Sequence, residues 1–222
     1  MGKSGLYSDK TNVKFDDFQA SLGFARDPKG FRLSGTASAS ITGGHLQVDS
    51  GAWGGVAVVD GFTGTTYTVQ VVVDPSDVGE QNEIWIHYQD ANNAYRVTVY
   101  SQNEIHLDRV KNGQWANLYM YAVGGASNQT VTVTYLFTGG AYKIRVYVDF
   151  VQKFEVTESQ IPSGQVALGS APFSGPAKFD NLKVGYDNNA DGDLNDAGDD
   201  VLISETFGST SKTSRKSYGS ST

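Results

Sequence analysis

The sequence predicts an all-β protein, an antiparallel two-sheet sandwich, and three observations lead to that prediction. Short runs rich in Val, Ile, Tyr, Thr and Phe recur along the chain, a composition that suits half-buried strands. Gly, Asn, Asp and Ser separate these runs as tight turns do. No stretch shows the roughly 3.6-residue apolar period of an amphipathic helix. Many strands, tight turns and no helices together favour two packed antiparallel sheets.

Taken in order, the chain divides into a lead-in, one domain and a tail. Residues 1–14 are polar and unpatterned, so we expect a flexible lead-in. Residues 15–207 carry the strands without a repeat or a composition break, which predicts a single domain. Residues 208–222 are mainly Ser, Thr, Lys and Gly, have little to bury, and predict a flexible tail. The expected strands are His45–Asp49, Val56–Asp60, Thr66–Val73, Glu83–Gln89, Ala94–Tyr100, Glu104–Val110, Asn117–Tyr121, Thr130–Phe137, Ala141–Asp149, Val151–Val156, Gln165–Leu168 and Lys178–Tyr186.

Composition excludes several kinds of site and partner. The 222-residue chain has no cysteine, so it has no disulfide, thiolate zinc site or cysteine nucleophile. Its net charge is −7 and no basic stripe runs through it, which argues against nucleic acid as a partner. No apolar run approaches the roughly 20 residues of a membrane helix, so we expect no membrane insertion.

Alternation along four middle strands predicts a binding surface. Side chains of a strand point alternately to its two faces. One face is expected to carry the core, with Ile84, Val97 and Leu107 and also Tyr88, Leu118 and Met120. The other face is expected to gather polar and aromatic side chains on one surface: Trp85, His87, Arg96, Tyr100, His106, Asp108, Tyr119 and Tyr121.

That surface has the chemistry of a carbohydrate site. Sugar rings pack their C–H groups on Trp and Tyr, while their hydroxyls pair with Asp, Arg and His. The alternative is that the aromatic residues form cross-strand pairs that only stabilise the sheet. Both interpretations stay open at this point.

Catalysis by the same surface is less favoured by the sequence. A glycosidase commonly places two carboxylates about 5–10 Å apart across the scissile bond. The carboxylates available here, Glu83, Glu104 and Asp108, are spread over two strands rather than gathered in one acidic motif. The three histidines are not accompanied by a Gly-x-Ser-x-Gly elbow. We therefore assign no catalytic residue, and a glycoside-active enzyme remains an alternative.

An acidic loop between residues 187 and 200 predicts a structural calcium site. Asp187, Asn189 and Asp191 occupy positions 1, 3 and 5 of a calcium-loop template, and Gly192 follows at position 6. Leu194 takes the place of the buried apolar residue, but Gly198 stands where the template has Glu. The predicted Ca²⁺ ligands are Asp187, Asn189, Asp191, Asp193, Asp196 and Asp199. The alternative is a solvated acidic linker.

Several short motifs, in a fixed order, carry a family resemblance. They are Asp16-Asp17-Phe18, the strand bearing Trp85 and His87, Asn93 to Val97, Ile161 to Leu168, and Phe179-Asp180-Asn181-Leu182-Lys183-Val184. In this order, residues 15–186 resemble the concanavalin A-like lectin/glucanase superfamily, in particular its laminin-G-like and keto-disaccharide-hydrolase-like bacterial jelly rolls. The acidic segment that follows resembles segments of large bacterial surface proteins of the RHS/YD-repeat type.

The resemblance implies a two-sheet jelly roll, frequent calcium and frequent glycan binding. We therefore expect a non-catalytic carbohydrate-binding module, with a polysaccharide or glycan as partner and one structural Ca²⁺. We expect it to be monomeric and to lie outside the cell or on its surface, within a larger bacterial protein. A structural or adhesion spacer is the second expectation, because this fold serves lectins, hydrolases and spacers alike.

Overall fold

The computed structural model describes residues 31–51, 55–75, 81–100, 104–123, 128–171, 175–207 and 213–215, and every regular element in these ranges is a β-strand. The all-β prediction is therefore confirmed. The predicted lead-in 1–14 and Asp16-Asp17-Phe18 lie outside the described residues. None of the described ranges contains a helix suited to crossing a membrane.

The strands are β1 (Phe31–Ser34), β2 (Ser38–Thr42), β3 (His45–Asp49), β4 (Val56–Val59), β5 (Tyr67–Val73), β6 (Gln81–Asp90), β7 (Asn93–Tyr100), β8 (Glu104–Lys111), β9 (Gln114–Ala122), β10 (Gln129–Thr138), β11 (Ala141–Val148), β12 (Val151–Thr157), β13 (Gln165–Ser170), β14 (Ala177–Tyr186), β15 (Asp200–Glu205) and β16 (Thr213–Arg215). The twelve predicted strands correspond to β3 through β14. Of the predicted tail, residues 213–215 are described, and they form β16 against β15.

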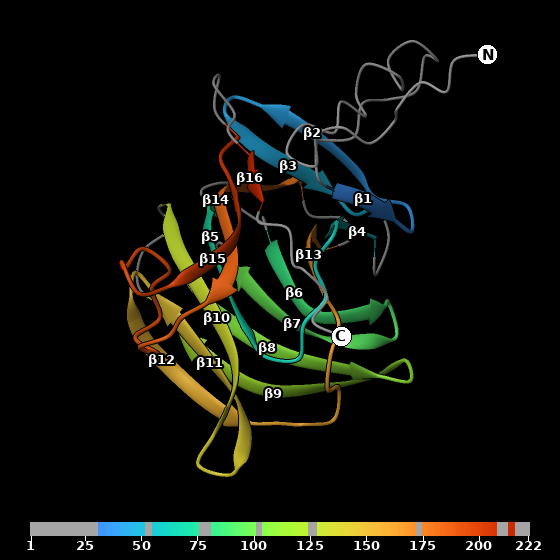
Figure 1. Cartoon of the computed structure of the whole chain (residues 1–222). Coiled ribbons are helices and arrows are strands. Elements are labelled where there is room, and N and C mark those ends of the chain that lie inside the picture. The colour runs from blue at the N-terminus through green and yellow to red at the C-terminus, as the bar shows by residue number, and fades with distance from the viewer. Residues whose placement is uncertain are drawn as a thin grey trace, which may run out of the picture.

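Two antiparallel sheets pack face to face, as the two layers of Figure 1 show. The seven-stranded sheet has the order β1-β4-β13-β6-β7-β8-β9. The nine-stranded sheet has the order β12-β11-β10-β5-β14-β15-β16, with β3 added to β14 and β2 added to β3. The predicted two-sheet antiparallel sandwich is thus confirmed.

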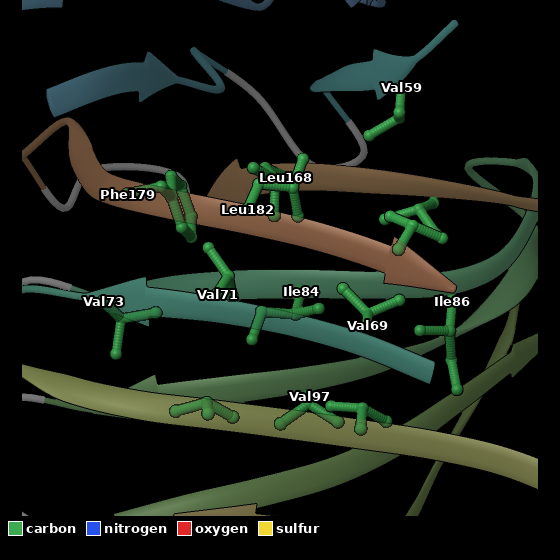
Figure 2. Close-up of a cluster of buried hydrophobic side chains, with 14 of the residues drawn as sticks. Val59, Val69, Val71, Val73, Ile84, Ile86, Val97, Leu168, Phe179 and Leu182 are labelled. Atoms are coloured by element: carbon green, nitrogen blue, oxygen red, sulfur yellow. The ribbon is translucent and has the colours of Figure 1, made fainter. Parts of the chain in front are cut away.

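One hydrophobic core fills the space between the sheets. Figure 2 shows part of it, with labelled side chains contributed by strands of both sheets, among them Val69 and Val71 of β5 and Ile84 and Ile86 of β6. These side chains are fully buried. Because strands alternate their side chains, the next residue on each strand points to an outer face of the sandwich.

Candidate functional site

The outer face of the seven-stranded sheet carries a buried ion triad. Arg96 of β7 donates from Nη1 to Glu83 Oε1 at 2.7 Å and from Nη2 to Asp108 Oδ2 at 2.8 Å. All three side chains are buried. Glu83 lies on the neighbouring strand β6 and Asp108 on β8, directly opposite Arg96. Two carboxylates thus fix the plane of one guanidinium, since such charge-assisted bonds are directional.

Trp115 of β9 lies over this triad and remains open to solvent. The Arg96 guanidinium carbon is 4.3 Å from the centre of the Trp115 ring and 5.7 Å from that of Trp85. The two indole rings meet edge to face with centres 6.1 Å apart. Trp85 is 0% exposed, whereas Trp115 is 45% exposed. The contact with a guanidinium is favourable and holds the exposed ring in place.

Polar side chains continue this outer face along β8 and β9. Asn117 Nδ2 donates to Asp108 Oδ1 at 2.9 Å. His106 Nε2 lies 3.1 Å from Glu104 Oε2, and the His106 ring lies against Tyr100, with ring centres 4.5 Å apart. Burial raises the pKa of the Tyr100 hydroxyl above its ordinary value. The face therefore offers hydrogen-bond donors and acceptors beside an aromatic ring.

A depression of about 180 Å³ lies beside Trp115, at the hairpin that joins β8 to β9. Its lining includes Arg109, Lys111, Gln114 and Gln160 together with Trp115. Arg109 is held by Glu158, with Nη1 2.6 Å from Oε2. Arg109 and Lys111 alternate with Asp108 and Val110 along β8, so their side chains point to the other side of the hairpin from the Trp115 ring, which pairs with Val110.

The prediction that His87 shares this outer face is wrong, because a β-bulge reverses the alternation of β6. The register between β6 and β7 shifts between Ile86 and Asp90, and His87 has a positive φ of 50°. His87 is buried in the core, where its ring centre lies 4.0 Å from that of Tyr135. Tyr88, predicted in the core, instead packs on Trp85 in a second buried cluster.

The predicted faces of Tyr119, Met120 and Tyr121 are also wrong, because a second bulge shifts the alternation of β9. The register between β8 and β9 shifts between Leu107 and Asp108, so that Tyr119 pairs with the core residue Leu107. The Tyr119 ring stacks on Phe154 of β12, with centres 4.6 Å apart, and Tyr121 lies against the same ring at 6.5 Å. Met120, predicted in the core, lies opposite His106 and is exposed.

The eight predicted side chains therefore occupy three places. The outer face holds Trp85, Arg96, Tyr100, His106 and Asp108; the core holds His87; the open edge between β9 and β12 holds Tyr119 and Tyr121. Trp115 was missed because the strand was expected to begin at Asn117. Asn112-Gly113 was the available signal: both residues have positive φ, as in a two-residue hairpin, and this turn pairs Trp115 with Val110.

The acidic loop, residues 187–199, is seated on the outer face of the nine-stranded sheet. Leu194 N donates to Gln70 Oε1 of β5 at 2.7 Å, and the Tyr147 hydroxyl of β11 donates to Ala190 O at 3.3 Å. Leu194 is buried, as expected for the apolar residue of such a loop. Gly192 has φ +89°, and a Cβ there would lie 2.3 Å from the Tyr147 ring. Only glycine allows the loop to approach the sheet so closely.

Within the acidic loop, one amide lies between two carboxylates. Asn189 Nδ2 donates to Asp191 Oδ2 at 3.0 Å and to Asp196 Oδ2 at 2.8 Å. Asp187 Oδ2 accepts from Gly192 N at 2.8 Å, while its buried Oδ1 has no partner. Burial raises the pKa of Asp187, and the nearby Asp191 carboxylate raises it further.

The other two predicted ligands hold the backbone of the loop. Asp193 Oδ1 accepts from Asn195 N at 2.7 Å. Asp199 accepts from Asn188 N at 3.1 Å and from Asp196 N at 3.2 Å. Across the described part of the chain, no three carboxylate, imidazole or thiol side chains are arranged to hold a metal ion.

Comparisons with known proteins bear on the fold. No protein-family model matches the chain, and no curated protein matches it. The carbohydrate binding module CBM66 from Bacillus subtilis has a similar structure, with a TM-score of 0.56 and 18% sequence identity over 70% of this chain and 94% of that one. A Bacillus subtilis protein of unknown function with a galectin-like fold gives a TM-score of 0.52 and 9% identity, over 70% of this chain and 89% of that one. The chain has the concanavalin A-like fold.

In this concanavalin A-like sandwich, the carboxylates considered for catalysis are engaged. Glu83 Oε1 accepts from Arg96 and its Oε2 from Trp85 Nε1 at 2.9 Å. Asp108 accepts from Arg96 and from Asn117. Burial raises the pKa of Glu83, and the Arg96 guanidinium opposes that rise. Glu83 and Asp108 thus converge on one guanidinium rather than face each other across an open gap, as the two carboxylates of a glycosidase do.

Proposed function

We propose that the chain binds carbohydrate through the outer face of β7, β8 and β9, with Trp115 as the stacking platform. The observation that carries this proposal is the position of Trp115: its ring is fixed by Arg96 yet 45% exposed. A sugar ring gains from packing its C–H groups on such an indole. Similarity of fold to a carbohydrate binding module supports the same conclusion but does not identify the sugar.

The neighbouring polar groups would orient the sugar. Asn117 keeps an exposed side chain next to Asp108, and His106 with Glu104 extends the row of donors and acceptors. Small-molecule sites commonly combine an aromatic ring with a few polar groups that converge beside it. We infer a non-catalytic binding module, with a spacer domain as the competing function.

Trp115→Ala tests this proposal. The variant should lose at least tenfold in affinity on a glycan array or in affinity gel electrophoresis, because the stacking surface is removed. Phe137→Ala is the matched control, since Phe137 is 59% exposed on the nine-stranded sheet. Its affinity should equal that of the wild type. Equal binding by Trp115→Ala and wild type would assign Trp115 to the sheet alone and favour the spacer.

We also infer that the acidic loop binds Ca²⁺ in a structural role. The specific observation is the buried Asp187 Oδ1 without a hydrogen-bond partner, in the same loop as the Asn189 amide that bridges Asp191 and Asp196. An unpaired buried carboxylate oxygen is costly, and a cation would offset that cost. Ca²⁺ would draw Asp187, Asn189, Asp191 and Asp196 together from their positions in this structure and turn the Asn189 amide, so that each offers an oxygen, the ligand that Ca²⁺ prefers. The bound ion would neutralise the carboxylates and hold the loop against β5 and β11.

Thermal melting in a calcium titration tests the second inference. A ligand that binds only the folded state raises the free energy of unfolding, by about 2.7 kcal/mol when its concentration is one hundred times Kd. The melting temperature therefore rises with the concentration of the ligand. The rise should appear with Ca²⁺ and vanish in Asp187→Asn. Mg²⁺ at the same ionic strength controls for screening. An unchanged melting temperature with millimolar Ca²⁺ would leave the loop as a solvated acidic linker.

A further inference from the structure

A second depression lies on the opposite side of the sandwich, on the outer face of the nine-stranded sheet. Its volume is about 320 Å³. Strands β5, β10 and β14 and the acidic loop all contribute to its lining, which includes Gln70, Thr130, Phe150, Asn181, Lys183 and Asn195. It is thus separate from the Trp115 face, which belongs to the other sheet. The volume lies at the lower end of the roughly 300–1,000 Å³ typical of ligand pockets.

The lining has the chemistry of a site for a neutral, hydroxyl-rich ligand. Gln70, Asn181 and Asn195 bring amides, which both donate and accept hydrogen bonds. None of the described residues that line the depression is acidic. Lys183 donates to two neutral oxygens, Leu194 O at 3.3 Å and Asn195 Oδ1. Paired donors and acceptors match the hydroxyl groups of a sugar.

Phe150 is the aromatic member of the lining, and its backbone is strained. It is the second residue of the two-residue turn between β11 and β12, with φ +64° after Asp149 at +49°. Such turns favour Asn-Gly, because a large side chain in the left-handed region is disfavoured. Phe150 nevertheless remains 47% exposed, so burial does not account for its presence. Strained residues of this kind concentrate at ligand sites.

The turn that carries Phe150 is anchored to the wall of the same depression. Asp149 N donates to Thr130 O at 2.8 Å, and Asp149 Oδ1 accepts from Thr130 N at 2.9 Å. These two bonds join Asp149 of the turn to both the N–H and the carbonyl group of Thr130 in β10. On the facing wall, a register shift between Asp180 and Lys183 forms a bulge at Asn181, which has φ +50°. Bulges re-aim side chains next to functional sites.

We propose that this depression is a second carbohydrate site, which takes one neutral sugar ring stacked on Phe150. The amides of Gln70 and Asn181 pair with its hydroxyls, next to the Asn195 amide, which is held by Lys183 and Asp193. A neutral sugar is favoured over an acidic one because the several aspartates of the bordering loop outweigh the single cation of the lining, Lys183. The site is independent of the Trp115 face, so the chain would hold two sugars on opposite sides.

Phe150→Gly separates a ligand role from a structural one. Glycine adopts φ +64° without strain, so the variant should melt no lower than the wild type. Its loss of the ring should lower affinity at this site by at least tenfold. The probes are methyl glycosides of glucose, galactose, mannose, xylose and N-acetylglucosamine, titrated into ¹⁵N-labelled protein. The side-chain amide signals of Gln70, Asn181 and Asn195 report binding directly.

The outcomes distinguish the two sites. We expect these amide signals to shift in the wild type, in Trp115→Ala and in the control Phe137→Ala, and to remain still in Phe150→Gly. Shifts that persist unchanged in Phe150→Gly would overturn the stacking role. Amide signals that no neutral glycoside moves in the wild type would overturn the second site, whatever happens at Trp115. If the glycosides shift only the Trp115 indole signal and none of the three amide signals, only the Trp115 face binds sugar.

Discussion

At the scale of single residues, His87 shows what sequence alternation could not predict. Its position in β6 was expected to face solvent, but the side chain is 0% exposed in the core. Nδ1 lies 2.6 Å from Ile161 O, and buried Nε2 has no partner. Gly164 packs directly on the backbone of His87, where a Cβ would lie 2.3 Å from its carbonyl carbon. A bulge in β6 and the distant Gly164 create this environment, and the local sequence of β6 reveals neither of them.

Burial of His87 predicts a loss of stability in acid. Burial lowers the pKa of His87 to about 4, whereas the imidazole of the unfolded chain titrates near 6.5. The unfolded state therefore binds the extra proton first, so stability is full above pH 6.5 and falls as the pH drops toward 4. A pKa shift of this size corresponds to a loss of unfolding free energy on the order of 3 kcal/mol once the pH falls below 4.

His87→Asn tests this linkage. Asn tolerates a positive φ and has an amide donor for Ile161 O, but it does not titrate. Urea unfolding of both proteins between pH 4 and 7 should show a steeper fall for the wild type. Parallel curves would mean that other groups, such as the aspartates of the acidic loop, set the acid limit.

At the scale of elements, the sequence predicts strands well and their faces only as far as the first bulge. On β7 and β8 the alternation is confirmed: Val97 and Leu107 are in the core, and Arg96 and Asp108 are on the outer face. On β6 and β9 it fails beyond the bulges near His87 and Leu118. One extra residue inverts every later side chain, because the period of a strand is two.

The missed strands have a different cause. β15 follows the acidic loop, and its residues Asp200–Glu205 form a strand by pairing with β14 on one side and β16 on the other. Its start is polar, so local composition could not distinguish it from the loop. The seat of the acidic loop likewise depends on Gln70 and Tyr147, which lie on distant strands. Non-local pairing of this kind is set by the whole fold rather than by any short stretch.

At the scale of the whole molecule, the two outer faces differ in chemistry while sharing one core. The seven-stranded sheet presents a neutralised ion triad beneath Trp115. The nine-stranded sheet presents a polar depression and the acidic loop, which carries much of the net charge of −7.

The shared core predicts that the sandwich unfolds in one cooperative step. A single buried cluster joins strands of both sheets, from Phe31 of β1 to Phe207 after β15, so neither sheet can lose its partner and keep a buried face. At roughly 0.7 kcal/mol per residue, residues 31–207 should give a calorimetric enthalpy of about 120 kcal/mol near 60 °C. Calorimetry should show one peak whose van't Hoff enthalpy equals the calorimetric value, with near- and far-UV circular dichroism changing together.

Because the acidic loop lies outside the core, Ca²⁺ should move this peak without splitting it. Two resolved peaks in the presence of Ca²⁺ would show instead that the sheets, or the loop with β14 and β15, unfold as separate units.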